Sequence, residues 1–329
     1  MVTQRRARDS RTVARAGVGA AVALLLPAAM LACAGPNVST PMPASAAAST
    51  PAASGVFEPG EGDRAGVVEI GNGREMYLEC SGTGDPTVVF ISGAGVAADN
   101  WQYADLASEE PDDSAVYSQT AQFTRVCAYD RPGTKQWQGA PSRSTTVPQP
   151  TTAQGDAADL HALLMVADVA GPYVIVGHSW GGLIATSFAR TYPDEISGIV
   201  LVDPGSQYLQ TVLPQDVWTQ WMQLIAGTGL EHPDLEAPDY PASIAALEAT
   251  PALPAIPAVV MSADTPFDYL GIGDAQAHWP EWIEAHALLA ASLGATHVTQ
   301  THSGHFVENE NPALVLKQIC SVVSPMRGC

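Results

Sequence analysis

Short apolar runs that end in small or polar residues alternate along the chain with longer segments whose apolar positions recur every three or four residues. The strand-like runs occupy residues 67–70, 76–80, 87–91, 125–129, 173–177, 199–202, 258–261 and 296–301. Helical spacing marks residues 153–169, 181–192, 280–293 and 312–323. Uniformly apolar strands that alternate with helices predict an α/β fold, with a mostly parallel sheet covered by helices on both faces.

Two segments depart from this alternation. The first two strand-like runs flank residues 71–73 (GNG), a sequence typical of a hairpin, so we expect the sheet to begin with an antiparallel pair. Residues 205–256 contain no strand-like run, but Trp218 and Trp221 lie on an apolar helical face. We interpret this segment as a small helical cap. Its aromatic side chains either line a pocket or pack the cap onto the sheet.

The N-terminal region is typical of an exported protein. Residues 1–15 hold five arginines and one aspartate, and an apolar stretch with small residues follows, which predicts a signal peptide over residues 1–32. The apolar stretch approaches the roughly 20 residues of a membrane-spanning helix, so a retained anchor is an alternative. Residues 30–33 (MLAC) resemble a bacterial lipobox, in which Cys33 is lipidated; plain secretion is the other alternative. Residues 33–64 are rich in alanine, serine and proline and predict a disordered linker before a domain over residues 65–329.

The net charge and the cysteine content bear on the partners of the protein and on its disulfide bonds. A net charge of −20 argues against a nucleic-acid partner, which would require a basic surface. Beyond Cys33 the chain has four cysteines, Cys80, Cys127, Cys320 and Cys329. An even number in an exported chain predicts two disulfides, for which three pairings are possible. A Cys320–Cys329 bond would close a short C-terminal loop, and Cys80–Cys127 would then join two predicted strands.

The clearest chemical signal is residues 177–181 (GHSWG), which lie between a predicted strand and a predicted helix. They match the G-x-S-x-G nucleophile elbow, in which a sharp turn exposes the serine hydroxyl. Gly177 and Gly181 supply the small residues that such a turn requires. The helix that follows directs its N-terminal amides toward Ser179, which favours a negative charge developing there.

With the elbow in this position, residues 65–323 resemble the α/β-hydrolase superfamily. Four further segments carry the resemblance. Residues 86–95 resemble the third strand and oxyanion loop, 126–133 (VCAYDRPG) the fourth strand and its turn, 199–204 the sixth strand, and 303–312 (SGHFVENENP) the catalytic-histidine loop. The second and fourth strands are neighbours in that fold, so the resemblance also supports a Cys80–Cys127 bond.

The resemblance implies a catalytic triad in the chain order serine, acid, histidine. Ser179 is then the nucleophile and His305 the base, because His305 follows a glycine as the family's histidine does and the rival His302 does not. The acid follows the strand at 258–261 in most members, which favours Asp264. Asp203, at the end of the preceding strand, is the alternative that some members use.

The resemblance also implies an oxyanion hole made by the backbone amides of Trp180 and of Ala94 or a neighbour. The loop departs from the family's usual His-Gly beginning, since it has Ser92-Gly93. We expect His178 to pack beside the elbow with its side chain directed away from the serine hydroxyl. No pair of histidines has the spacing of a metal site, so we expect no catalytic metal and no cofactor.

The sequence therefore predicts an exported serine hydrolase, either secreted or held at the cell surface by a lipid, that acts on a small carboxylic ester. Other chemistries of the same scaffold, those of an aminopeptidase or a cofactor-free haloperoxidase, are alternatives. A surface binding protein without catalytic activity is a further alternative, because a fold does not by itself decide a function. The only membrane contact that we expect is through the N-terminal lipid.

Overall fold

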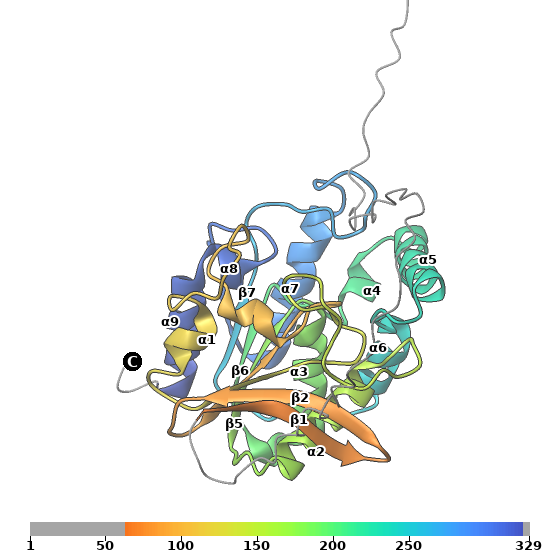
Figure 1. Ribbon diagram of the computed structural model, residues 1–329. Helices are drawn as coiled ribbons and strands as arrows, with labels where there is room; N and C mark the ends of the chain where they lie inside the picture. The colour runs from red at the N-terminus through yellow and green to blue at the C-terminus, as the bar shows by residue number, and fades with distance from the viewer. Residues whose placement is uncertain (1–62, 325–329) are drawn as a thin grey trace, which may run out of the picture. The chain divides into compact units, whose positions relative to one another are not determined.

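The computed structural model describes residues 63–324, which form an eight-stranded sheet (Figure 1). The predicted signal peptide, Cys33, nearly all of the linker and Cys329 lie outside these residues. The strand order is β1-β2-β4-β3-β5-β6-β7-β8. The strands are β1 (Arg64–Gly71), β2 (Arg74–Ser81), β3 (Thr87–Ile91), β4 (Val126–Tyr129), β5 (Tyr173–His178), β6 (Ile196–Val202), β7 (Ala258–Met261) and β8 (Thr296–Val298).

Strand directions follow the prediction. β1 and β2 form the expected antiparallel hairpin, and β2 is also antiparallel to β4. All pairs from β4 through β3, β5, β6 and β7 to β8 are parallel. The expected mostly parallel α/β sheet is confirmed. Parallel strands direct their carboxyl ends to one edge of the sheet, and the loops that leave this edge carry the candidate catalytic residues.

Helices cover both faces of the sheet, which explains why the central strands are uniformly apolar. On one face Val89, Ile175 and Leu201 belong to a buried cluster that also includes residues of α2, α3 and α7. On the other face the alternating residues, such as Val88 and Val174, belong to a cluster with α1 and α9. The helices outside residues 205–256 are η1 (Ala98–Gln102), α1 (Val116–Thr120), α2 (Ala153–Val166), α3 (Trp180–Thr191), η2 (Pro193–Glu195), α7 (Trp279–Leu293), α8 (Val307–Glu310) and α9 (Pro312–Val323).

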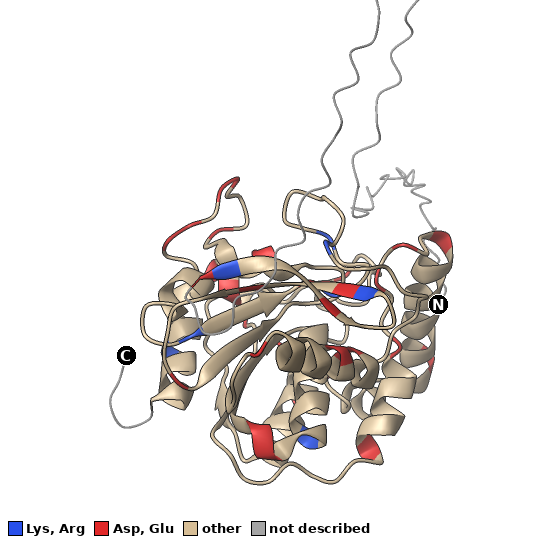
Figure 2. Ribbon diagram, turned by 60° about the horizontal axis from the view of Figure 1, so that its bottom comes forward, with Lys and Arg blue, Asp and Glu red and all other residues tan. Residues whose placement is uncertain are grey.

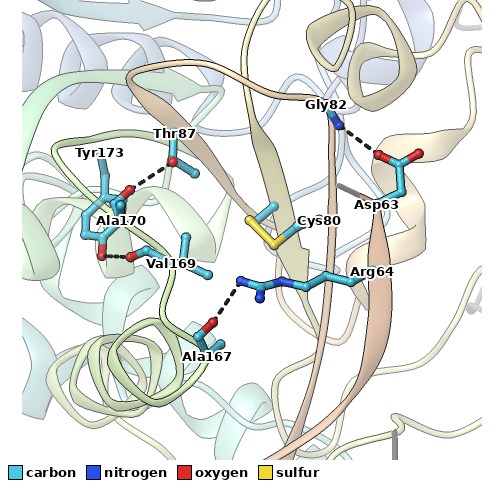
Figure 3. The surroundings of a disulfide bond; sticks show 10 residues. Asp63, Arg64, Cys80, Gly82, Thr87, Ala167, Val169, Ala170 and Tyr173 are labelled. Carbon is cyan, nitrogen blue, oxygen red and sulfur yellow. Dashed lines mark hydrogen bonds between the residues drawn. A yellow bond between two sulfur atoms is a disulfide. The ribbon is translucent and has the colours of Figure 1, made fainter. Parts of the chain in front are cut away.

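A disulfide joins two neighbouring strands of the sheet, as predicted. Cys80 on β2 lies directly opposite Cys127 on β4, and the two are bonded (Figure 3). Both residues are buried. Next to this bond, the Nη2 atom of Arg64 donates a hydrogen bond of 2.8 Å to the carbonyl of Ala167, which ties β1 to the end of α2. Because Cys329 lies outside the described residues, the Cys320–Cys329 bond stays a prediction.

Three helices lie between β6 and β7: α4 (Leu209–Val212), α5 (Gln215–Glu231) and α6 (Tyr240–Glu248). Trp218 and Trp221 of α5 are buried and contact the ring of Tyr240. The Tyr240 ring in turn lies 4.8 Å from that of Trp180 at the start of α3. Both roles considered for the aromatic residues of the cap are therefore observed, since Trp218 and Trp221 pack onto the body of the protein and Trp221 also lines a pocket with Leu270 of the loop after β7.

The distribution of charge is consistent with the acidic composition. Figure 2 shows Asp and Glu residues at several loops and helices, with few Lys and Arg residues among them. Within residues 63–324, no helix has both the length and the apolar character needed to cross a membrane.

Candidate active site

Ser179 occupies a sharp turn between β5 and α3. Its backbone has φ 52° and ψ −123°, a conformation that L-residues rarely adopt. A side chain at position 177 would collide with the backbone of Gly181, and one at position 181 would collide with the backbone at Ile91. The two glycines of the motif are thus required by the close approach of α3 to β5 and β3. The carbonyl of Ser179 accepts hydrogen bonds from the amides of Gly182 and Gly205, which hold the turn.

His305 is paired with Asp203. The Nδ1 atom of His305 lies 2.7 Å from the Oδ2 atom of Asp203, although 102 residues separate the two in sequence. The ring of His305 lies 4.6 Å from that of His178, the residue before Ser179. The elbow, the loop after β8 and the end of β6 therefore meet at the carboxyl edge of the sheet.

The expectation that Asp264 partners the histidine is corrected by this geometry. The two carboxylate oxygens of Asp264 accept hydrogen bonds from the backbone amides of His302 and Ser303, at 3.0 and 3.1 Å. Asp264 therefore holds the loop that leads to His305 and does not contact the imidazole. His302, the rival base, has a side chain that is 82% exposed and lies near Asp264. The structure thus favours His305 and assigns its orientation to Asp203.

Asp203 is buried and well supplied with hydrogen-bond donors. Its Oδ1 atom accepts from the amide of Ala263 at 2.8 Å and from the indole Nε1 of Trp282 at 3.1 Å. Burial by itself would raise the pKa of Asp203, but the hydrogen bond from His305 and the nearby ring of His286 outweigh it, and the pKa is lowered. The carboxylate is therefore ionised at neutral pH and can stabilise a protonated His305.

Aromatic rings enclose His305. Phe267, in the loop after β7, stacks on the imidazole with ring centroids 4.1 Å apart and planes at 20°. Trp282 of α7 meets the same imidazole edge to face at 6.0 Å. The side chain of His305 is only 16% exposed. These contacts fix the ring plane and exclude water from most of it, while the hydrogen bond to Asp203 fixes which nitrogen faces inward.

The loop after β3 lies against the elbow. A β-carbon on Gly93 would lie 3.1 Å from the β-carbon of Ser179, so a glycine permits this approach. The buried Ser92, which stands where the family usually has histidine, donates from its hydroxyl to the carbonyl of Ala97 at 2.9 Å. This bond gives the loop an internal support of its own. Ala94 follows Gly93 in the same loop, and Trp180 is the first residue of α3. The oxyanion role expected of their two amides stays a prediction.

Comparison with known proteins identifies the family of the chain. The family model described as "Alpha/beta hydrolase family" matches residues 88–318. The chain belongs to the alpha/beta hydrolase family. An esterase from Thermogutta terrifontis superimposes with a TM-score of 0.50 at 20% identity, over 79% of this chain and 97% of the esterase. A hydrolase from Pseudomonas aeruginosa gives a TM-score of 0.52 at 19% identity, over 80% and 99% of the two chains.

Similarity to curated proteins is more limited. An uncharacterized protein of Schizosaccharomyces pombe is 34% identical over 148 residues, which are 40% of this chain. The match spans only 26% of that protein's length. The family model establishes the family of this α/β hydrolase and the structural neighbours agree with its fold, whereas its substrate is a separate question.

A second buried histidine supports the site of this α/β hydrolase. The Nε2 atom of His178 lies 3.0 Å from the carbonyl oxygen of His305, which can only accept, so Nε2 donates. Burial, together with the nearby His305, holds the pKa of His178 well below its usual value, so the ring is neutral and its Nδ1 atom is an acceptor. The Oε1 atom of Glu308 lies 3.0 Å from that Nδ1. The two atoms are within contact distance, but their orientation does not make a hydrogen bond.

Glu308 is suited to hold a proton at neutral pH. Its side chain is buried, and burial, reinforced by Asp203 and Glu310, raises its pKa to about 8. The Nδ2 atom of Asn100 donates to its Oε1 atom at 2.9 Å. Sequence reasoning placed His178 beside the elbow but missed Glu308 as its neighbour. An acid three residues after the candidate base His305 was the available signal.

We expect the protein to lose stability as the pH rises from about 4.5 to about 8, in part through Glu308. In this window the native state holds the Glu308 proton and the unfolded chain releases it, so unfolding is favoured by about 1.4 kcal/mol per pH unit. The variant Glu308→Gln cannot ionise and should show a smaller loss. Urea unfolding at pH 5 and pH 8 measures the difference.

The matched control for this experiment is Glu248→Gln, which changes an exposed glutamate at the end of α6. It should retain the pH dependence of the wild-type protein. If Glu308→Gln loses as much stability between the two pH values as the wild type does, the buried proton on Glu308 is excluded.

The structure shows no cluster of metal-ligating side chains among residues 63–324. Within residues 63–324, no three side chains of histidine, cysteine, aspartate or glutamate lie close enough together to hold one. The histidines that do lie together, His178, His286 and His305, each direct a ring nitrogen to a carbonyl or a carboxylate. What this site of the α/β hydrolase offers is a hydroxyl group, a base with a fixed orientation and backbone amides.

Proposed function

We propose that this protein is an exported serine hydrolase that cleaves carboxylic esters. The observation that carries the proposal is the 2.7 Å contact between His305 and Asp203, beside a serine on a strained strand-to-helix turn. A serine hydroxyl is a poor nucleophile unless a base removes its proton, and a base of this kind requires a third group to hold its tautomer. The three residues occur in the order serine, acid, histidine.

The proposed reaction proceeds by acyl transfer. The Oγ atom of Ser179 attacks the ester carbonyl while the Nε2 atom of His305 accepts the hydroxyl proton. The negative charge that develops on the carbonyl oxygen is stabilised by the amides of Ala94 and Trp180. The intermediate collapses, His305 returns the proton to the departing alcohol, and the acyl group stays on Ser179. Water, activated by the same histidine, then releases the acid.

An ester is the substrate class favoured by the surroundings of the site. Phe267, Trp282 and the adjacent Tyr269 give the region around His305 an apolar and aromatic character. Apolar surroundings of this kind suit an uncharged acyl or alcohol group. The structural neighbour from Thermogutta terrifontis is itself described as an esterase, which agrees with this choice.

A serine-directed fluorophosphonate tests the proposal on the purified domain. We expect covalent labelling at Ser179 and turnover of p-nitrophenyl esters, and a series of acyl chains would size the binding site. A folded protein that neither reacts with the probe nor hydrolyses any ester of the series would contradict the proposed activity and favour a binding function.

Export and lipidation of Cys33 are part of the proposal. They rest on the arginine-rich, then apolar, N-terminal sequence and on the MLAC motif at residues 30–33. In a bacterial host that processes lipoproteins, Cys33→Ser should move the protein from the membrane fraction to the soluble fraction. An unchanged membrane fraction would contradict lipidation at Cys33. The wild-type protein processed in parallel is the control.

A further inference from the structure

A fully buried ion pair lies below the loop that carries Ala94. The Nε atom of Arg131 lies 2.6 Å from the Oε1 atom of Glu236, and each side chain is 1% exposed. Arg131 comes from the turn after β4, and Glu236 comes from the segment between α5 and α6. A buried ion pair costs much of its attraction in lost hydration, so its presence is weak evidence for a role in stability.

The remaining hydrogen bonds of the pair go to the loop after β3. The Nη2 atom of Arg131 donates to the carbonyl of Gly93 at 2.7 Å. The Oε2 atom of Glu236 accepts from the amide of Gly95 at 2.6 Å. These two groups belong to the two peptide units that flank Ala94. The ion pair therefore holds the backbone of the loop on both sides of that residue.

The bond to Gly93 has a direct consequence for the amide of Ala94. The carbonyl of Gly93 and the N–H of Ala94 are parts of one planar, trans peptide unit and point in opposite directions. By fixing the carbonyl from the buried side, Arg131 fixes the direction of the N–H. Ala94 itself is exposed, while Gly93 is buried against Ser179. The orientation of this N–H decides whether it can stabilise a negative charge at Ser179.

Glu236 is fixed in turn by the body of the protein. Its amide donates to the carbonyl of Gly133 at 2.9 Å. Gly133 has φ +80°, and a β-carbon there would lie 2.6 Å from the Glu236 nitrogen, so only glycine permits this contact. Two further backbone bonds join Thr151 to Ala237 and Asp239. The cap is thereby connected to the oxyanion loop through one carboxylate.

We propose that Arg131 and Glu236 are positioning residues that orient the Ala94 amide, so that the cap segment completes the oxyanion hole. The inference rests on the proposed serine hydrolase function. Amide donors accelerate a reaction only when they are held in place before charge develops. Loosening the loop should therefore weaken binding of the transition state more than binding of the ester.

Glu236→Gln tests the inference, because it keeps the shape of the side chain and removes its charge. We expect kcat for a p-nitrophenyl ester to fall about 10- to 100-fold, somewhat less than on deleting an oxyanion donor, with KM changed less than about twofold. A phenylboronic acid, whose tetrahedral adduct with serine resembles the transition state, should lose affinity by a similar factor. A purely structural role would not produce this parallel loss.

Arg131→Lys is the second variant, because lysine keeps the charge and lacks the fork that reaches both Gly93 and Glu236. It should show the same pattern. The matched control is Asp159→Asn, which removes the carboxylate of the partly exposed Arg74–Asp159 pair and should leave kcat unchanged. Circular dichroism and thermal melting establish that each variant is folded.

Three other results would overturn the inference. Unchanged kcat and boronate affinity in the folded variants would reject it and leave the proposed function intact, since the wild type still turns over. Failure of both variants to fold would assign the ion pair to the fold as a whole. A wild-type protein without labelling or turnover would reject the proposed function, and the inference with it.

Discussion

Replacing Ser179 with alanine should lower kcat for ester hydrolysis by about 10⁴- to 10⁶-fold while the protein stays folded. The substitution removes only the hydroxyl group. Because alanine keeps the β-carbon, it also keeps the backbone strain of the elbow. Steady-state kinetics with p-nitrophenyl acetate and labelling with a fluorophosphonate measure the effect. Substantial turnover by the folded alanine variant would exclude Ser179 as the nucleophile.

A glycine at position 179 provides a matched comparison. It removes the same hydroxyl, so Ser179→Gly should be equally inactive. Glycine adopts φ 52° without the steric cost that serine bears, so this variant should also be more stable than the alanine variant, by about 1–3 kcal/mol. Urea unfolding of the two variants measures the strain stored in the elbow. Equal stabilities would show that the turn is relaxed.

Asp203→Asn should lower kcat by about 10⁴-fold, the second largest effect that we expect. The Oδ2 atom of Asp203 accepts from His305, and its Oδ1 atom accepts from Ala263 and Trp282. An asparagine has one acceptor oxygen, so its NH₂ group must face a donor on one side or the other. The imidazole of His305 is then held in the wrong tautomer or the wrong orientation. Its protonated form also loses the negative charge that stabilises it.

Asp264→Asn is the control that separates the two candidate acids. The oxygens of Asp264 meet backbone amides of the loop before His305, so the amide variant should lose less than about tenfold in kcat through looser positioning of that loop. Kinetics and thermal melting of both variants decide the assignment. A large loss in Asp264→Asn together with an active Asp203→Asn would reverse it.

The two acids show why the sequence did not suffice to choose between them. β6 and β7 are adjacent and parallel, and each is followed within three residues by an aspartate. Which carboxylate reaches His305 depends on the turn of the backbone, and Asp203 has φ 40°. The amide of Ala263, just after β7, donates to Asp203, so the second loop supports the acid carried by the first.

Some elements could not be predicted from sequence patterns. α1 and α8 have five and four residues, too few to display helical periodicity. β8 ends at Val298, although the apolar and threonine-rich run continues to residue 301. Just beyond this run, the amides of His302 and Ser303 bind Asp264, a contact with a distant residue that no local pattern shows.

The sequence by itself determined the alternation of strands and helices, the hairpin and the serine on its turn. These features depend on side-chain periodicity and on small residues at tight turns, which are readable along a single chain. The residues alone left three cysteine pairings open, and it was the family resemblance that favoured the observed Cys80–Cys127 bond. Only the tertiary structure decided the acid partner of His305, 102 residues away, and the pairing of Arg131 with Glu236, 105 residues away. Such pairs depend on how packed loops direct individual side chains, a property that no local pattern encodes.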